Sequence, residues 1–212
     1  AKASGSRILS VGVGNAVITV DDTADLDDAA EKIRISKTLD LAASCSSDNS
    51  VILLDAIYDE MLDKLVHQGG YIVTEEEKKL LQNVIWTDGL INAGVVAQPP
   101  EKIAGMAGFG LPEGRRFFIV PETGAGPDYP FSGEKMTVTM ALYRARDLDH
   151  AIELTNAIQA YQGQGHSCGI YSRSDENILK LAMATRTSRV MVNQPQSASN
   201  SGNLWNGMRQ TF

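Results

Sequence analysis

An α/β fold, with a largely parallel sheet flanked by helices, is the fold class that the sequence predicts. Short apolar runs alternate along the 212 residues with segments whose apolar residues recur at helical spacing, which is typical of parallel sheets. Hydrophobic residues make up 43% of the chain and aromatic residues only 6%, so we expect an aliphatic core. The length suits one large domain or two small ones. No internal repeat is evident.

The expected elements follow from these two kinds of segment. Six apolar runs bounded by polar or glycine-containing turns are expected to form strands, over 16–20, 51–54, 115–120, 137–143, 168–171 and 189–193. Six segments with helical periodicity are expected to form helices, over 24–41, 55–68, 74–85, 101–107, 147–161 and 174–184. The helix residues expected to face the core are Leu26, Ala30, Ile33, Ile57, Met61, Leu65, Leu80, Leu81, Val84, Ile85, Leu148, Ile152 and Ile158.

Several helix ends carry recognisable signals. Aspartates in the first turn of the helix 24–41 complement the helix dipole, and Gly69-Gly70 is expected to end the helix 55–68. Thr74-Glu75-Glu76-Glu77 forms a capping box at the start of the third helix. The longest loop, 121–133, is rich in proline and glycine, and a loop of this length in a compact domain is seldom inert filler.

Composition excludes several classes of function. The net charge is −7 without a basic block, which argues against nucleic acid as a partner, and no apolar run approaches the roughly 20 residues of a membrane helix. There is no secretory signal. The two cysteines lie far apart without metal-ligand spacing, so neither a disulfide framework nor a metal site is expected. These features predict a protein of a reducing compartment, the cytoplasm.

Cys45 is the first of three polar features that lie at junctions between elements. It occupies a link of small polar residues between the helix 24–41 and the strand 51–54, where backbone N–H groups can approach a thiol and favour its thiolate. A buried structural cysteine is the alternative.

The other two junction features are Glu134, which the loop 121–133 delivers to the following strand, and the turn Gly165-His166-Ser167. Ligands gather at strand ends in open α/β sheets, so the three features are expected to converge. Thiol and imidazole together indicate acyl transfer or a thiol hydrolase, while Glu134 could also be a salt-bridge partner. Gly12-x-Gly14 invites a dinucleotide-binding interpretation, but the full fingerprint before a helix is absent.

Five segments resemble the catalytic domain of the coenzyme A-acylating aldehyde dehydrogenases. They are Gly12-Val13-Gly14-Asn15 with Asp21-Asp22-Thr23-Ala24-Asp25, the stretch 36–52 around Cys45, Phe131-Ser132-Gly133-Glu134-Lys135-Met136, Gly165-His166-Ser167, and Arg189-Val190-Met191-Val192-Asn193 followed by a proline. The resemblance covers nearly the whole chain in the right order and implies the fold of that catalytic domain. The chain departs from many family members at Leu41-Ala42, where they carry glycine or Asn-Gly.

The resemblance implies NAD- or NADP-dependent oxidation of an aldehyde to an acyl-coenzyme A. The Cys45 thiolate would attack the aldehyde to form a thiohemiacetal, hydride would pass to the nicotinamide, and coenzyme A would release the resulting thioester. The N–H of Cys45 would help to hold the oxyanion. Glu134 matches a carboxylate that contacts the nicotinamide-side ribose. His166 matches a histidine beside the active site that would assist thioester turnover or the positioning of coenzyme A.

Hydrolytic relatives place a general-base glutamate upstream of the nucleophile, whereas this chain has no glutamate before Glu31, which fits release by a thiol instead of water. The tail 193–201 is somewhat similar to members that act on sulfoacetaldehyde, and Arg186 or Arg189 could pair with such an anion. A solvated loop with surface arginines is the alternative.

Residues 1–212 are expected to form the nucleophile-bearing domain of a longer protein, because the cofactor-binding domain and closing segment of family members have no counterpart here and the chain begins at Ala1. Alone, the chain is expected to be inactive; in full length, it is expected to be a homo-oligomer. Two alternatives stay open: a non-catalytic relative of the same fold, and a thiol hydrolase using Cys45 and His166. The sequence does not determine which aldehyde is used, or the choice between NAD and NADP.

Overall fold

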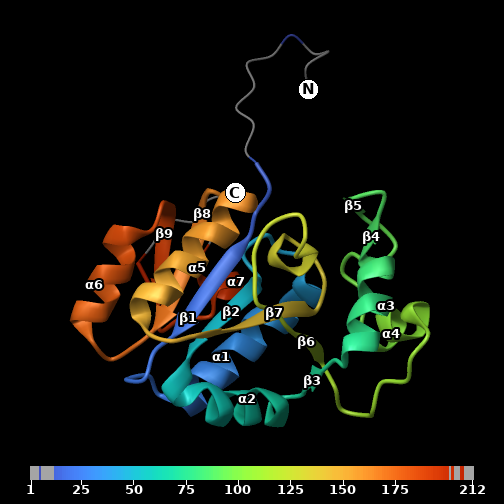
Figure 1. Ribbon diagram of the computed structural model, residues 1–212, viewed down its shortest axis with the longest axis horizontal. Coiled ribbons are helices and arrows are strands. Elements are labelled where there is room, and N and C mark those ends of the chain that lie inside the picture. The colour runs from blue at the N-terminus through green and yellow to red at the C-terminus, as the bar shows by residue number, and fades with distance from the viewer. Residues whose placement is uncertain (1–4, 6–11, 201, 203–205, 208–212) are drawn as a thin grey trace.

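A computed structural model describes residues 5, 12–200, 202, 206 and 207. Seven strands within this part of the chain form one sheet, in which every neighbouring pair is parallel (Figure 1). The order across the sheet is β3-β6-β7-β2-β1-β8-β9. The strands are β1 (Ala16–Val20), β2 (Asp48–Leu54), β3 (Gly70–Ile72), β6 (Phe117–Pro121), β7 (Thr139–Ala145), β8 (Gly165–Tyr171) and β9 (Thr187–Val192). The predicted α/β fold class is confirmed.

Helices connect these strands and cover both faces of the sheet. They are α1 (Leu26–Thr38), α2 (Tyr58–His67), α3 (Glu75–Ile85), α4 (Pro100–Ala107), α5 (Leu148–Tyr161), α6 (Asp175–Ala184) and α7 (Gln196–Ser199). The chain moves from β1 through β2 to β3 in one direction across the sheet, and from β7 through β8 to β9 in the other. Because such crossovers are right-handed, α1 and α2 cover one face and α5 and α6 the opposite face.

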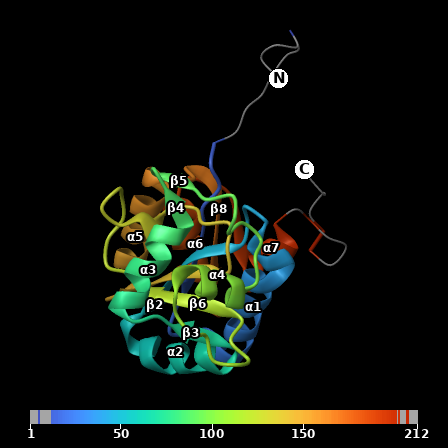
Figure 2. The same cartoon turned by 90° about the vertical axis from the view of Figure 1, so that its right-hand side faces the viewer.

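The remaining elements are short. The 3₁₀ helices of the described residues include η2 (Leu39–Ala42), η3 (Asp55–Ile57) and η4 (Pro130–Ser132). Strand β4 (Trp86–Thr87) pairs with β5 (Leu90–Ile91) in a separate antiparallel hairpin. This hairpin, α3 and α4 lie together at one end of the sheet, beyond β3 and β6 (Figures 1 and 2). None of the described helices has the length and apolar character needed to cross a membrane.

Local sequence signals account for most helix ends. Asp25 accepts a hydrogen bond from the N–H of Asp28 at the start of α1, and Thr74 and Glu77 form the predicted capping box of α3. Gly69 follows the end of α2 with φ +97°, the left-handed conformation that a glycine adopts without strain.

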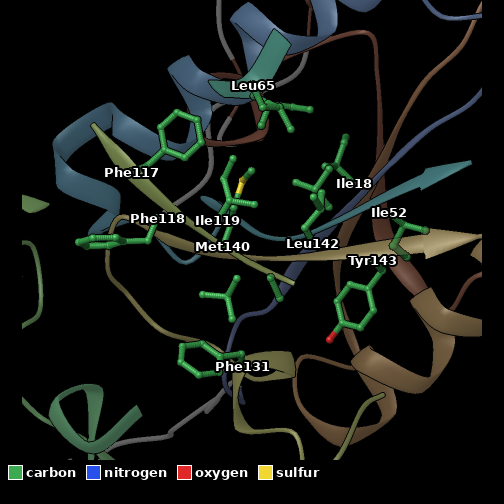
Figure 3. Close-up of a cluster of buried hydrophobic side chains, with 14 of the residues drawn as sticks. Ile18, Ile52, Leu65, Phe117, Phe118, Ile119, Phe131, Met140, Leu142 and Tyr143 are labelled. Carbon is green, nitrogen blue, oxygen red and sulfur yellow. The ribbon is translucent and has the colours of Figure 1, made fainter. Parts of the chain in front are cut away.

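The core is largely aliphatic, as expected, with aromatic rings toward the end of the sheet that carries β6 and β7. Figure 3 shows Leu65 of α2 near Phe117 on one side of the sheet, and Phe131 and Tyr143 on the other. Leu81 and Ile85 of α3 are fully buried, but Leu80 is 40% exposed, so its assignment to the core is wrong.

Several boundaries differ from those expected. The first helix ends at Thr38 and not at Leu41, because Asp40, Leu41 and Ala42 adopt positive φ and turn the chain. Strand β2 begins at Asp48, three residues early, and β8 begins at Gly165, so that His166 lies in a strand and not in a turn. Strand β3, the β4–β5 hairpin and α7 were not predicted.

Candidate active site

The three predicted junction features lie at the same edge of the sheet. Gly14 and Asn15 directly precede β1, Cys45 precedes β2, Glu134 precedes β7, and His166 is the second residue of β8. These four parallel strands are neighbours in the order β7-β2-β1-β8, so their amino ends share one edge. All three features therefore lie at the amino ends of these strands, and the contacts around Gly14 bring two of them, Cys45 and Glu134, together.

Cys45 lies exposed in a tight turn that is anchored to α1. The N–H of Ser47 donates to the carbonyl of Ser44 (3.0 Å), and the Ser47 hydroxyl donates to the carbonyl of Ser36 (3.1 Å). Among the described residues, the N–H of Cys45 donates to no acceptor. An exposed thiol beside a free backbone donor suits a nucleophile whose product carries an oxyanion.

Gly14 brings the thiol and the carboxylate of Glu134 together. A methyl group built on Gly14 would lie 2.7 Å from Cβ of Cys45, 3.0 Å from the Cys45 carbonyl oxygen and 3.0 Å from Oε1 of Glu134. The N–H of Gly14 donates to the Glu134 carboxylate. Only a residue without a side chain allows this approach.

Glu134 is held in place from α5. The side-chain oxygen of Gln162 accepts a hydrogen bond from the N–H of Glu134 (2.9 Å). Asn15 in turn donates to the carbonyls of Ser132 (2.7 Å) and Gln162 (3.2 Å). Desolvation raises the pKa of the buried Glu134 carboxyl, while the Lys135 charge, the Gly14 N–H and the Lys37 charge lower it.

His166 lies on the other side of β1 from Cys45. Its Nδ1 is 3.1 Å from the hydroxyl of Ser167, and burial lowers its pKa, which favours the neutral imidazole. Ser188 donates its hydroxyl to the carbonyl of His166. Among the described residues, no hydrogen bond joins His166 to Cys45, so the geometry gives no support to the thiol-hydrolase alternative.

Two fully buried lysines and a buried aspartate lie behind this edge, and the sequence analysis did not identify them as part of the site. The Lys135 ammonium group donates to the carbonyls of Phe131 (2.6 Å) and Gly133 (2.8 Å). Lys37, in the last turn of α1, has no hydrogen-bond partner for Nζ among the described residues. Burial lowers the pKa of both lysines and raises the pKa of Asp48.

The described part of the polar tail is not a solvated loop, because its residues 196–199 form the helix α7, which packs against α1. Gln196 donates to Asp48 (2.9 Å) and to the carbonyl of Val17 (3.2 Å), and the N–H of Ser197 donates to the Ser36 hydroxyl (3.1 Å). Figure 2 shows α7 against α1. Ser201 lies outside the described residues.

The two candidate anion-binding arginines lie near the same edge. Arg186 is exposed directly before β9, and its carbonyl accepts a hydrogen bond from the N–H of Gly165 (3.0 Å). Arg189 is partly buried within β9, opposite Ser167 of β8.

The second cysteine and the largest of the described cavities lie apart from this site. Cys168 is buried in β8 with its sulfur 3.5 Å from the hydroxyls of Thr185 and Thr187, and burial raises its pKa. A cavity of about 440 Å³ lined by Glu122 and Arg144 lies at the carboxyl ends of β6 and β7.

Comparison with known proteins gives the family. No protein-family model matches the chain. An acylating sulfoacetaldehyde dehydrogenase of Cupriavidus necator is 40% identical over 206 residues, which are 96% of this chain and 42% of that protein. Among solved structures, an acetylating aldehyde dehydrogenase of Geobacillus thermoglucosidasius has a TM-score of 0.89 and 30% identity, covering 92% of this chain and 43% of that one.

A propionaldehyde dehydrogenase from a fucose-utilisation microcompartment of Clostridium phytofermentans gives a TM-score of 0.86 at 30% identity, over 99% of this chain and 47% of that one. The chain thus spans less than half the length of these relatives. Its fold matches that of the corresponding part of the two solved structures. It belongs to the acylating aldehyde dehydrogenase family.

Proposed function

We propose that this chain is the nucleophile-bearing part of an enzyme that oxidises an aldehyde to an acyl-coenzyme A with NAD or NADP. The observation that carries the proposal is the meeting of the exposed Cys45 and the Glu134 carboxylate across Gly14, at one edge of the sheet. A non-catalytic relative would have no need for a glycine packed against a solvent-exposed thiol.

Cys45 performs the covalent steps. Its thiolate forms a bond to the aldehyde carbon, and the carbonyl electrons move to the oxygen, where the free N–H of Cys45 stabilises the negative charge. NAD or NADP, when bound, supplies the acceptor for the hydride that leaves this carbon. The Cys45 thioester that results is attacked by the coenzyme A thiolate, and the bond to the Cys45 sulfur breaks, which restores the thiolate.

Glu134 fits the role of a ribose ligand. Glu134 is largely buried, its carboxylate accepts the Gly14 N–H and it lies next to Cys45, so hydroxyl groups that approach it would be desolvated and well oriented. Because Gln162 and Asn15 fix the backbone at this point, the carboxylate is oriented before the cofactor arrives.

His166 is proposed to accept the proton of the coenzyme A thiol. Burial keeps its imidazole neutral near neutral pH, which a proton acceptor requires. In the segment 12–15 before β1, the described residues carry no carboxylate that could activate water, which favours a thiol as the second nucleophile.

We propose that the substrate is a small anionic aldehyde of the sulfoacetaldehyde class, because the related enzyme of Cupriavidus necator carries that name. The exposed Arg186, at the same edge as His166, is the candidate partner for the sulfonate. We further propose that the full-length protein is a cytoplasmic homo-oligomer and that its cofactor-binding part lies outside residues 1–212.

The test is formation of acyl-coenzyme A by the full-length protein containing this chain, supplied with NAD or NADP, coenzyme A and a panel including sulfoacetaldehyde, acetaldehyde and succinate semialdehyde. Turnover should be lost in Cys45→Ser and kept in Cys168→Ser. The 212-residue chain by itself should show negligible turnover, because Glu134 alone is a weak hold on NAD or NADP and the cofactor-binding part is proposed to lie outside residues 1–212. Cleavage of an ester or thioester substrate by the same protein without NAD or NADP would instead indicate a thiol hydrolase.

Thiol labelling separates the proposal from a non-catalytic relative. Iodoacetamide should modify the exposed Cys45 faster than the buried Cys168 near neutral pH. Equal labelling of both cysteines, together with full activity of Cys45→Ser, would leave the proposal without support.

A further inference from the structure

Gln196 is a buried polar residue that has no part in the covalent steps. It is the first residue of the helix α7, and its side chain is fully buried. The Nε2 amide group donates to two acceptors, Oδ1 of Asp48 in β2 (2.9 Å) and the carbonyl of Val17 in β1 (3.2 Å). One side chain from the tail therefore joins the beginnings of two neighbouring strands.

The two acceptors lie on either side of an irregularity in the sheet. Residues 48 and 50 of β2 pair with successive residues of β1, so Asn49 between them has no partner residue on β1. One extra residue on one strand is a β-bulge, which bends the chain and is often found beside an active site. Gln196 spans this bulge, because Asp48 precedes the extra residue on β2 and Val17 follows the change of register on β1.

The helix α7 reaches both sides of the Cys45 turn. After the turn, Gln196 binds Asp48, which follows Cys45 by three residues. Before it, the N–H of Ser197 donates to the hydroxyl of Ser36 in α1 (3.1 Å), and the carbonyl of Ser36 accepts the hydroxyl group that holds the turn against α1. These partners are buried, so water does not readily replace a bond that is lost.

We propose that α7 positions the nucleophile, with Gln196 as the positioning residue that holds the bulge at the start of β2 and thereby fixes the thiol and the backbone N–H of Cys45. The inference rests on the proposed function for the role of Cys45. Glu134 has a separate support, because the side chain of Gln162 at the end of α5 accepts its N–H. The nucleophile and the cofactor-binding carboxylate are thus held by two different glutamines.

The same substitution at the two glutamines separates their roles in the full-length enzyme. Gln196→Met removes both hydrogen bonds of the side chain at similar size and should lower kcat about tenfold, while the KM for NAD or NADP changes little. A displacement of 1 Å at a reacting group costs about 10²-fold in rate, so a shift of roughly 0.5 Å accounts for this loss. Gln162→Met should have the opposite pattern, a raised KM for NAD or NADP with a smaller change in kcat at saturating cofactor, because it frees Glu134.

Thr155→Val is the control for the loss of a buried hydrogen bond away from the site. Its hydroxyl group, inside α5, donates to the carbonyl of Ala151 (2.8 Å), and the substitution should leave kcat unchanged. If Gln196→Met does not fold, Ser36→Ala decides the question, because it removes the hydroxyl that binds the Ser197 N–H and keeps the carbonyl that holds the turn. A lower kcat at unchanged KM in Ser36→Ala supports the inference, and an unchanged kcat overturns it.

Equal kcat values for Gln196→Met and Thr155→Val would overturn the inference, as would a raised KM for NAD or NADP at unchanged kcat in Gln196→Met. Amide hydrogen exchange, followed by mass spectrometry, provides a readout without turnover. The segment 43–50 should exchange faster in Gln196→Met than in Thr155→Val, whereas the segment 133–136 should not. If this difference occurs but the unaltered enzyme forms no acyl-coenzyme A, the proposed function fails and the positioning role stands. If acyl-coenzyme A forms and the difference is absent, the positioning role fails and the proposed function stands.

Discussion

Gly14→Ala is the substitution that tests the geometry of the site most directly. The new methyl group would lie 2.7 Å from Cβ of Cys45 and 3.0 Å from both the Cys45 carbonyl and Oε1 of Glu134. Carbon atoms in contact are separated by about 3.5–4.0 Å. The Cys45 turn must therefore retreat by about 1 Å, because its Cβ and carbonyl oxygen are fixed to the backbone, whereas the Glu134 side chain can rotate away.

A displacement of this size at a reacting atom typically lowers the rate by about 10²-fold. We expect Gly14→Ala to lose about that factor in kcat/KM for acyl-coenzyme A formation by the full-length enzyme. Overpacking at one buried contact should cost about 1–3 kcal/mol of folding free energy, so the variant should still fold. Steady-state kinetics and a denaturant titration measure the two effects separately.

Gly12→Ala is the matched control, since a methyl group at Gly12 would meet no atom within 4 Å. It shares the glycine-to-alanine change and lies two residues away, so any general effect of reduced chain flexibility is common to both. If Gly14→Ala retained the activity of Gly12→Ala, the close approach of Gly14, Cys45 and Glu134 would be refuted.

Three further predictions concern neighbouring features. Gly163→Ala would place a methyl group 2.6 Å from Cβ of Asn15 at a φ of +90°, so it should disturb the support of Glu134 and raise the KM for NAD or NADP. Thr74→Ala removes the α3 cap and should lower the free energy of unfolding by about 1 kcal/mol in urea titrations. Burial lowers the pKa of His166, so its contribution to stability is complete above the unfolded value of 6.5 and is lost as the pH falls; His166→Asn should flatten stability-against-pH curves below that pH.

Elements with strong local signals were predictable from the sequence. The helices α3, α5 and α6 are capped by Thr74, Asp147 and Ser174, whose side chains accept hydrogen bonds from N–H groups of the first turn. Such capping residues can be recognised in the sequence by their type. The three-residue strand β3 and the four-residue helix α7 were not predictable, because neither is long enough to show a period. Both form through tertiary contacts.

The position of the site at the ends of strands was predictable from the sequence, whereas the choice of the amino ends and the contacts within the site were not. Cys45, Glu134 and His166 each adjoin a strand, and parallel strands align like ends. The contact of Gly14 with Cys45 and Glu134 joins segments up to 120 residues apart along the sequence, and only the register between β1, β2 and β7 brings them together. Lys37 has the sequence pattern of a surface lysine near a helix end, yet it is fully buried in a helix that packs against α7 and β2.

The turn before the nucleophile shows how the fold overrides local preference at the site. Asp40, Leu41 and Ala42 adopt left-handed φ values of 47°, 51° and 61°, a conformation that leucine and alanine do not favour. Each left-handed non-glycine residue costs roughly 1–2 kcal/mol. Full burial of Ala42 and the hydrogen bond from Ser47 to Ser36 are two of the tertiary contacts that hold the turn in place. A helix continued through Leu41 would carry Cys45 away from the sheet edge, so the strained turn is what leaves the thiol exposed and its N–H free.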